Sequence, residues 1–179
     1  MKIYNDFQNG ILISIICVSC TPLIDINKTN TIASASPEEA SLSSRAMFLE
    51  GESAISKLRS YRGNTTPYCG NNLGDGNGGG LIYGYSKQNV KSGRAITVEV
   101  AALYLISSIY AERMDFASSP YLCDMNLSNL ERRALNTTEL IDRAWESVEA
   151  WDKDRLKYGI GDLKKRKIGP LSFGHVAFW

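Results

Sequence analysis

Apolar side chains recur at helical spacing in the first stretch of the chain that has a clear start signal. Ser36 can cap a helix, Pro37 suits the first helical position, and Glu39 completes a capping box. The apolar residues that follow fall on one side of such a helix: Met47, Phe48, Ala54, Ile55 and Leu58. The spacing therefore predicts a helix from Ser36 to about Ser60, with Gly51 as the position where it can bend.

A second stretch, from Ile96 to Ala111, is apolar on nearly every side. Its one charged residue is Glu99, which lies close to the start, where the helix dipole favours a carboxylate. Thr97 can cap this helix. Because a helix that is apolar all round packs on several faces, we expect it at the centre of the domain. It is too short to cross a membrane.

A third helix is predicted to start at the capping pair Asn136 and Glu139 and to stop at Gly159. Its expected buried side consists of Ile141, Ala144, Val148, Trp151 and Leu156. Its expected solvated face consists of Asp142, Arg143, Glu146, Glu149, Asp152 and Lys153. The basic run at 164–167 is interpreted as a solvated helix end.

The remaining segments carry weaker signals. Residues 63–80 contain seven glycines and four asparagines, which predicts a long loop, and residues 81–85 are consistent with a short strand. Residues 115–135 form a connection with a candidate short helix at 127–134, and the apolar tail at 171–179 is expected to pack inside. The sequence thus predicts a mainly α domain over residues 37–179, with three main helices and one long Gly/Asn-rich loop.

The N-terminal residues have the pattern of a targeting segment. An apolar run at 11–18, too short to span a bilayer, ends in Val18-Ser19-Cys20, and a Thr/Ser/Asn-rich stretch follows to residue 36. This pattern resembles the signal peptide and lipobox of bacterial lipoproteins. The resemblance implies that residues 1–19 are removed, that Cys20 carries lipid, and that residues 20–36 tether the domain. It further implies an anchor in the outer membrane, facing the periplasm or the cell surface. The alternative is that the apolar run starts a core element.

The resemblance also bears on the four cysteines. It assigns Cys17 to the signal peptide and Cys20 to the lipid, which leaves Cys69 and Cys123 for a disulfide in an oxidising compartment. Such a bridge would close a loop of about 54 residues and contribute roughly 4 kcal/mol. The alternative is two free buried thiols.

Composition and charge exclude several function classes. The chain has 20 Lys and Arg against 19 Asp and Glu, so it lacks the basic excess of a nucleic-acid-binding protein. With one histidine, His175, it has no multi-histidine metal site, and we expect no metal and no cofactor. The glycine string at 74–79 matches a dinucleotide fingerprint as letters but lacks the flanking strand and helix. His175 itself is expected to pack within the apolar tail.

Two functions remain open. The first is a non-catalytic envelope lipoprotein that binds another protein; its architecture resembles that of periplasmic immunity proteins that neutralise toxins. Its contact surface would be the Gly/Asn-rich loop with its neighbouring tyrosines, namely Tyr68, Asp75, Asn77, Tyr83 and Tyr85. The alternative is a small periplasmic hydrolase that uses carboxylates near the central helix, namely Glu99, Glu112, Asp115 and Asp124. Most aromatic residues, including Trp145, Trp151 and Trp179, are expected in the core.

Overall fold

A computed structural model of the protein describes residues 37–68 and 96–179. The helices are α1 (Pro37–Glu50), the 3₁₀ helix η1 (Gly51–Ala54), α2 (Ile55–Arg59), α4 (Val98–Ala111), α5 (Thr138–Tyr158) and α6 (Ile160–Lys165), and the strands are β1 (Leu122–Asp124) and β2 (Val176–Phe178). This part of the chain is mainly α-helical, as the sequence predicts. Cys20, Cys69, Asp75, Asn77, Tyr83, Tyr85 and the predicted strand at 81–85 lie outside the described residues.

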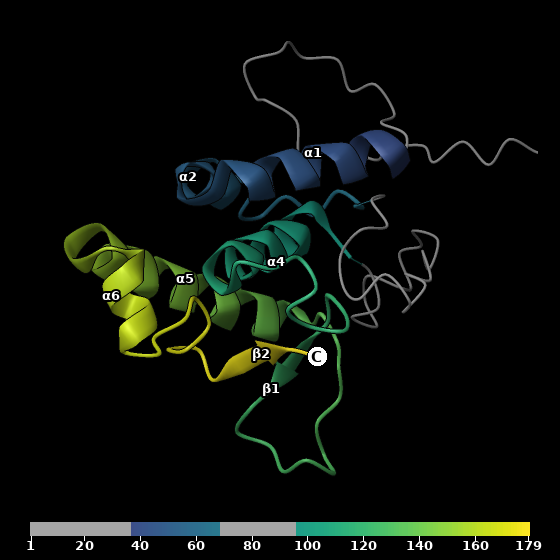
Figure 1. The fold of residues 1–179 in the computed structure, drawn as a ribbon. Helices are drawn as coiled ribbons and strands as arrows, with labels where there is room; N and C mark the ends of the chain where they lie inside the picture. Colours follow the sequence, from purple (N-terminus) through teal and green to yellow (C-terminus); the bar gives the residue numbers. More distant parts are fainter. Residues whose placement is uncertain (1–36, 69–95) are drawn as a thin grey trace, which may run out of the picture.

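The helices form layers around α4 (Figure 1). α1 and α2 pack on one side of α4, and α5 packs on another. All residues of α4 from Val98 to Ile109 are buried, which confirms its predicted central position. The Thr97 side chain accepts a hydrogen bond from the Val100 N–H, so the predicted cap forms.

The first predicted helix is interrupted at the expected glycine. Gly51 has φ +64°, and the chain continues as η1 and then α2. A positive φ costs glycine little because it lacks a Cβ. The break keeps Ala54, Ile55 and Leu58 buried against the core.

The third helix stops at Gly159, as predicted, but it differs from the prediction at its N-cap, in one expected buried residue and on its polar face. Thr137 is the N-cap, because the Asn136 side chain instead accepts from the Leu122 N–H and donates to the Pro120 carbonyl. Leu156 was predicted to be buried, but it is 71% exposed. Asp152 was predicted to be solvated, but it is 2% exposed.

The small sheet was missed by sequence reasoning. β1 and β2 are antiparallel, with Cys123 opposite Ala177. The predicted helix at 127–134 is replaced by turns, in which the Ser128 hydroxyl donates to Glu131. The sheet lies beside α5 in Figure 1 and places the C-terminal segment against the helical layers.

Candidate functional site

The described carboxylates of the hydrolase hypothesis each engage a different partner. Glu99 is 7% exposed and accepts from the Gly63 N–H at 2.9 Å, and its burial raises its pKa. Glu112 pairs with a lysine of α6 at 2.5 Å. Asp115 pairs with the arginine two residues before it at 3.1 Å, which lowers the pKa of Asp115. Asp124 is bound by an arginine of α5 that holds its pKa at about 2. Each of these carboxylates is therefore engaged within the protein.

Tyr68 and Cys123 lie in the interior. Tyr68 is 5% exposed, and its hydroxyl lies 2.6 Å from the Ser44 hydroxyl, so its ring is not an exposed anchor. Burial raises the pKa of Tyr68. Cys123 is buried, its Sγ lies 3.4 Å from the Ala177 carbonyl oxygen, and burial raises the pKa of its thiol. Since Cys69 lies outside the described residues, the disulfide stays a prediction.

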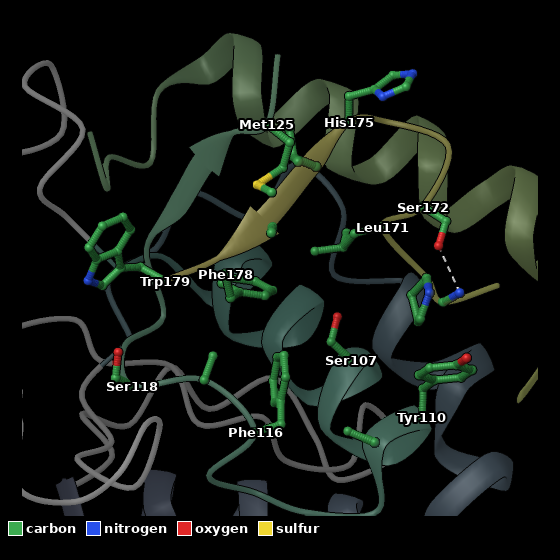
Figure 2. A pocket seen from close by; sticks show the side chains of 16 residues that line it. Ser107, Tyr110, Phe116, Ser118, Met125, Leu171, Ser172, His175, Phe178 and Trp179 are labelled. Carbon is green, nitrogen blue, oxygen red and sulfur yellow. Dashed lines mark hydrogen bonds between the residues drawn. The ribbon is translucent and has the colours of Figure 1, made fainter. Parts of the chain in front are cut away.

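A cavity of about 730 Å³ opens beside β2, and we call it the C-terminal groove. Its apolar walls include Tyr110, Phe116, Leu171, Val176, Phe178 and Trp179. Figure 2 shows these side chains arriving from α4, from the segment after it, and from the last residues of the chain. Its volume is typical of a ligand-binding cleft.

The groove is nearly free of charge. Among the described residues, no Asp, Glu, Lys or Arg side chain lines it, and the polar side chains that do are three serines, Tyr110, His175 and the indole of Trp179. The Ser107 hydroxyl donates to the Leu103 carbonyl, and the Ser172 hydroxyl accepts from the Gly169 N–H, so both are engaged within the protein. Burial raises the pKa of Tyr110 above its ordinary value of 10.0, so like any tyrosine it is neutral at pH 7. An uncharged, apolar binding partner fits this surface.

Two predictions about the tail were wrong, and both residues now border the groove. His175 is exposed, with φ +51°, and Figure 2 shows its ring directed away from the cavity. Trp179 is 55% exposed. Because successive side chains of an extended chain face opposite sides, Trp179 points outward while Val176 and Phe178 pack against the core. The apolar run Val176-Ala177-Phe178, which contains a β-branched and an aromatic residue, was the signal that could have revealed a strand here.

α5 fixes the wall of the groove. Arg143 donates to both Asp124 carboxylate oxygens, at 2.7 and 3.0 Å, and to the carbonyls of Gly174 and His175. The Ser147 hydroxyl donates to the Pro170 carbonyl at 2.8 Å and accepts from the Phe173 N–H at 3.0 Å. These contacts hold the 170–175 segment on α5, so the groove exists before any ligand binds.

Comparisons with models of protein families, with curated proteins and with solved structures found no match. Within residues 37–68 and 96–179, no helix has the length and apolar character needed to cross a bilayer. The same described ranges contain no group of three or more His, Cys, Asp or Glu side chains placed to hold a metal ion. The described residues therefore form a mainly helical fold with a largely apolar groove.

Proposed function

We propose that the protein is an envelope lipoprotein whose helical domain binds another protein without catalysing a reaction. Cys20 would carry the lipid, and residues 20–36 would tether the domain to the outer membrane, facing the periplasm or the cell surface. The partner could be a toxin that the domain neutralises, as in immunity proteins. The observation that carries the binding function is the uncharged C-terminal groove.

The groove supports binding over hydrolysis for a chemical reason. Hydrolysis by carboxylates needs an acid and a base on either side of the scissile bond. The carboxylates predicted for that role lie outside the groove lining and are held in separate contacts, such as Glu112 with Lys164 and Asp124 with Arg143. Apolar walls with aromatic residues are instead typical of the centre of protein interfaces.

The two candidate contact surfaces are the C-terminal groove and the Gly/Asn-rich loop. The loop residues Asp75, Asn77, Tyr83 and Tyr85 lie outside the described residues. Residues 63–68, at the start of the loop, are tied to the first turn of α4: the Val98 N–H donates to the Thr66 carbonyl at 2.8 Å. Both surfaces belong to the proposal and can be tested separately.

The test of binding is site-specific photo-crosslinking of the full chain in its native cells. A photoreactive side chain at Ser118, which is exposed and lines the groove, should give a discrete covalent adduct with one protein. The control position is Leu130, which is 98% exposed and does not line the groove. The absence of an adduct at Ser118 and at loop positions alike would contradict the binding function.

The test of anchoring is metabolic labelling with a palmitate analogue. Wild-type protein should be labelled and should sediment with membranes, and Cys20→Ser should abolish the labelling. Unlabelled wild-type protein in the soluble fraction would contradict the lipid anchor.

A further inference from the structure

The positive charges of the chain gather on one short stretch of sequence. Residues 153–167, which include the end of α5 and the whole of α6, contain seven Lys and Arg but two Asp. The rest of the chain carries 13 Lys and Arg against 17 Asp and Glu, so it has a net negative charge. In Figure 1, α6 and the C-terminal end of α5 lie at one end of the helical layers, away from the β1–β2 sheet. The protein therefore has a basic end although its total charge is close to zero.

Some of these cations are neutralised within the protein and others are not. Three of the seven form ion pairs, namely Arg155, Lys164 and Lys165. Within residues 37–68 and 96–179, no carboxylate lies within ion-pair distance of the other four, which are all exposed: Lys153, Lys157, Arg166 and Lys167. The unpaired charges are therefore available to an anion outside the domain.

Two of the unpaired cations share one aromatic ring. The Lys157 Nζ and the Arg166 Cζ each lie 4.7 Å from the centre of the Tyr158 ring. Each contact is a favourable cation–π interaction, but the two charges lie within about one Debye length of each other and repel. Lys153 adds a third charge one turn before Lys157 on the same face of α5, and like charges at this spacing lower helix stability. An anionic surface placed against the three cations would relieve this repulsion.

Exposed apolar groups lie among these charges. Leu156 is 71% exposed and follows Lys153 by three residues, so it lies on the same face of α5. Tyr158, between the two cations on its ring, is 37% exposed. A soluble polyanion offers a partner for the charges alone. A membrane surface offers anionic headgroups for the cations and, beneath them, an apolar layer for the leucine and the ring.

We propose that this basic patch, which consists of Lys153, Leu156, Lys157, Tyr158 and Arg166, docks the domain onto an anionic phospholipid surface. The three cations would contact the headgroups, while the leucine and the tyrosine ring enter the interface. This inference rests on the lipid anchor of the proposed function, which brings the domain to a membrane. Residues 20–36 span at most about 60 Å, roughly twice the length of α5, so a domain tethered at Cys20 can place this patch on the same membrane.

The first experiment measures co-sedimentation of the full chain, with its lipid site replaced (Cys20→Ser), with large unilamellar vesicles. One set of vesicles is phosphatidylcholine alone, and the other contains about 30% phosphatidylglycerol. A basic residue at an anionic surface raises the partition coefficient about fivefold, so the anionic vesicles should bind at least about 25-fold more tightly. High salt should remove this difference. The neutral vesicles also correct for any binding by the apolar run at 11–18.

Charge-removing variants locate the contact. Lys157→Gln combined with Arg166→Gln should lower the partition coefficient on anionic vesicles about 25-fold. Lys153→Gln should lower it about fivefold at an unchanged melting temperature, because Lys153 contacts no ring and forms no ion pair among the described residues. The matched control, Arg45→Gln combined with Arg133→Gln, removes two exposed charges elsewhere and should stay within about twofold of the parent chain.

A further variant tests whether the occupant is a membrane. Leu156→Ser keeps every charge of the patch but removes an apolar group from the interface, so it should lower the partition coefficient about threefold or more. An unchanged value would assign the patch to a soluble polyanion and overturn membrane docking. Equal binding to neutral and anionic vesicles would also overturn it, as would equal losses in the patch variants and in the matched control.

Failure of this inference can be told apart from failure of the proposed anchor. If the wild-type chain is labelled by the palmitate analogue but the Cys20→Ser chain shows no preference for anionic vesicles, docking is overturned and the anchor stands. If the wild-type chain is unlabelled but the Cys20→Ser chain binds anionic vesicles through the patch, docking is supported and the anchor is contradicted.

Discussion

A buried acidic residue on α5 makes the contacts whose loss should lower the domain's free energy of unfolding most. Asp152 is 2% exposed and lies between two guanidinium groups. Arg59 of α2 approaches one of its oxygens at 2.5 Å, and Arg155 of α5 approaches the other at 2.7 Å. Arg155 also pairs with Glu52 of η1 at 2.6 Å. This cluster joins α2 and η1 to α5.

The expected cost of Asp152→Ala follows from these contacts. A charge-assisted hydrogen bond has a net value of about 1.5–3 kcal/mol. Breaking a buried ion pair costs about 3–5 kcal/mol. Arg59 is 37% exposed, so water recovers part of its loss, whereas Arg155 is 10% exposed and keeps only Glu52. We therefore expect the free energy of unfolding to fall by about 3 kcal/mol.

Urea denaturation followed by far-UV circular dichroism measures this change. The matched control is Asp142→Ala, which removes an exposed carboxylate from the same helix and gains the same helix propensity. The control should alter the free energy of unfolding by less than about 0.5 kcal/mol. If Asp152→Ala and Asp142→Ala lower the free energy of unfolding equally, the buried cluster does not stabilise the domain.

Three further predictions concern the segment around the groove. The pKa of Asp124 is about 2 in the folded state, below its ordinary 3.8, so its ion pair stabilises the fold above about pH 4 and is lost towards pH 2. The difference in melting temperature between wild type and Asp124→Asn should therefore shrink as the pH falls over that range. A constant difference would contradict the pairing. Gly174→Ala should lower the free energy of unfolding by about 1–3 kcal/mol, because a Cβ there would lie 2.6 Å from a carbonyl oxygen of α5. The control Gly161→Ala in α6 adds a Cβ that meets no atom within 4 Å, so it should be neutral or stabilising in the same urea titration. Cys69 and Cys123 should form a disulfide, so the intact mass under non-reducing conditions should be two hydrogen atoms below the reduced mass. Rapid maleimide labelling of both cysteines in the native protein would contradict the bridge.

The helices were predictable because their signals are local. Thr97 before an apolar run and Gly159 after an amphipathic one mark helix ends within a few residues of sequence. The break at Gly51 was also visible as a position where a helix can bend. Such signals do not depend on what the helix later packs against.

The long-range polar contacts of the domain were not predictable in the same way. Asp152 and Arg143 occur on a helix face with solvated charges, and nothing in their spacing distinguishes them from Glu146 beside them. Their burial depends on Arg59, 93 residues away, and on Gly174, 31 residues away. Likewise Asn136 is a residue type that often caps helices, but its side chain instead accepts a hydrogen bond from the Leu122 N–H of β1. These roles depend on contacts between residues far apart in the chain, and a single sequence does not reveal such contacts.

Part of the wall of the C-terminal groove is held in place before any partner binds. A partner that has to order a flexible backbone segment loses about 1–2 kcal/mol for each residue fixed. The groove avoids this cost over one segment because Arg143 and Ser147 already hold the backbone from Pro170 to His175 on α5. A partner of the proposed kind would therefore bind without first ordering that wall. The polar residues of α5 thus support the binding surface without touching the partner, which explains how a nearly uncharged groove can depend on charged residues behind it.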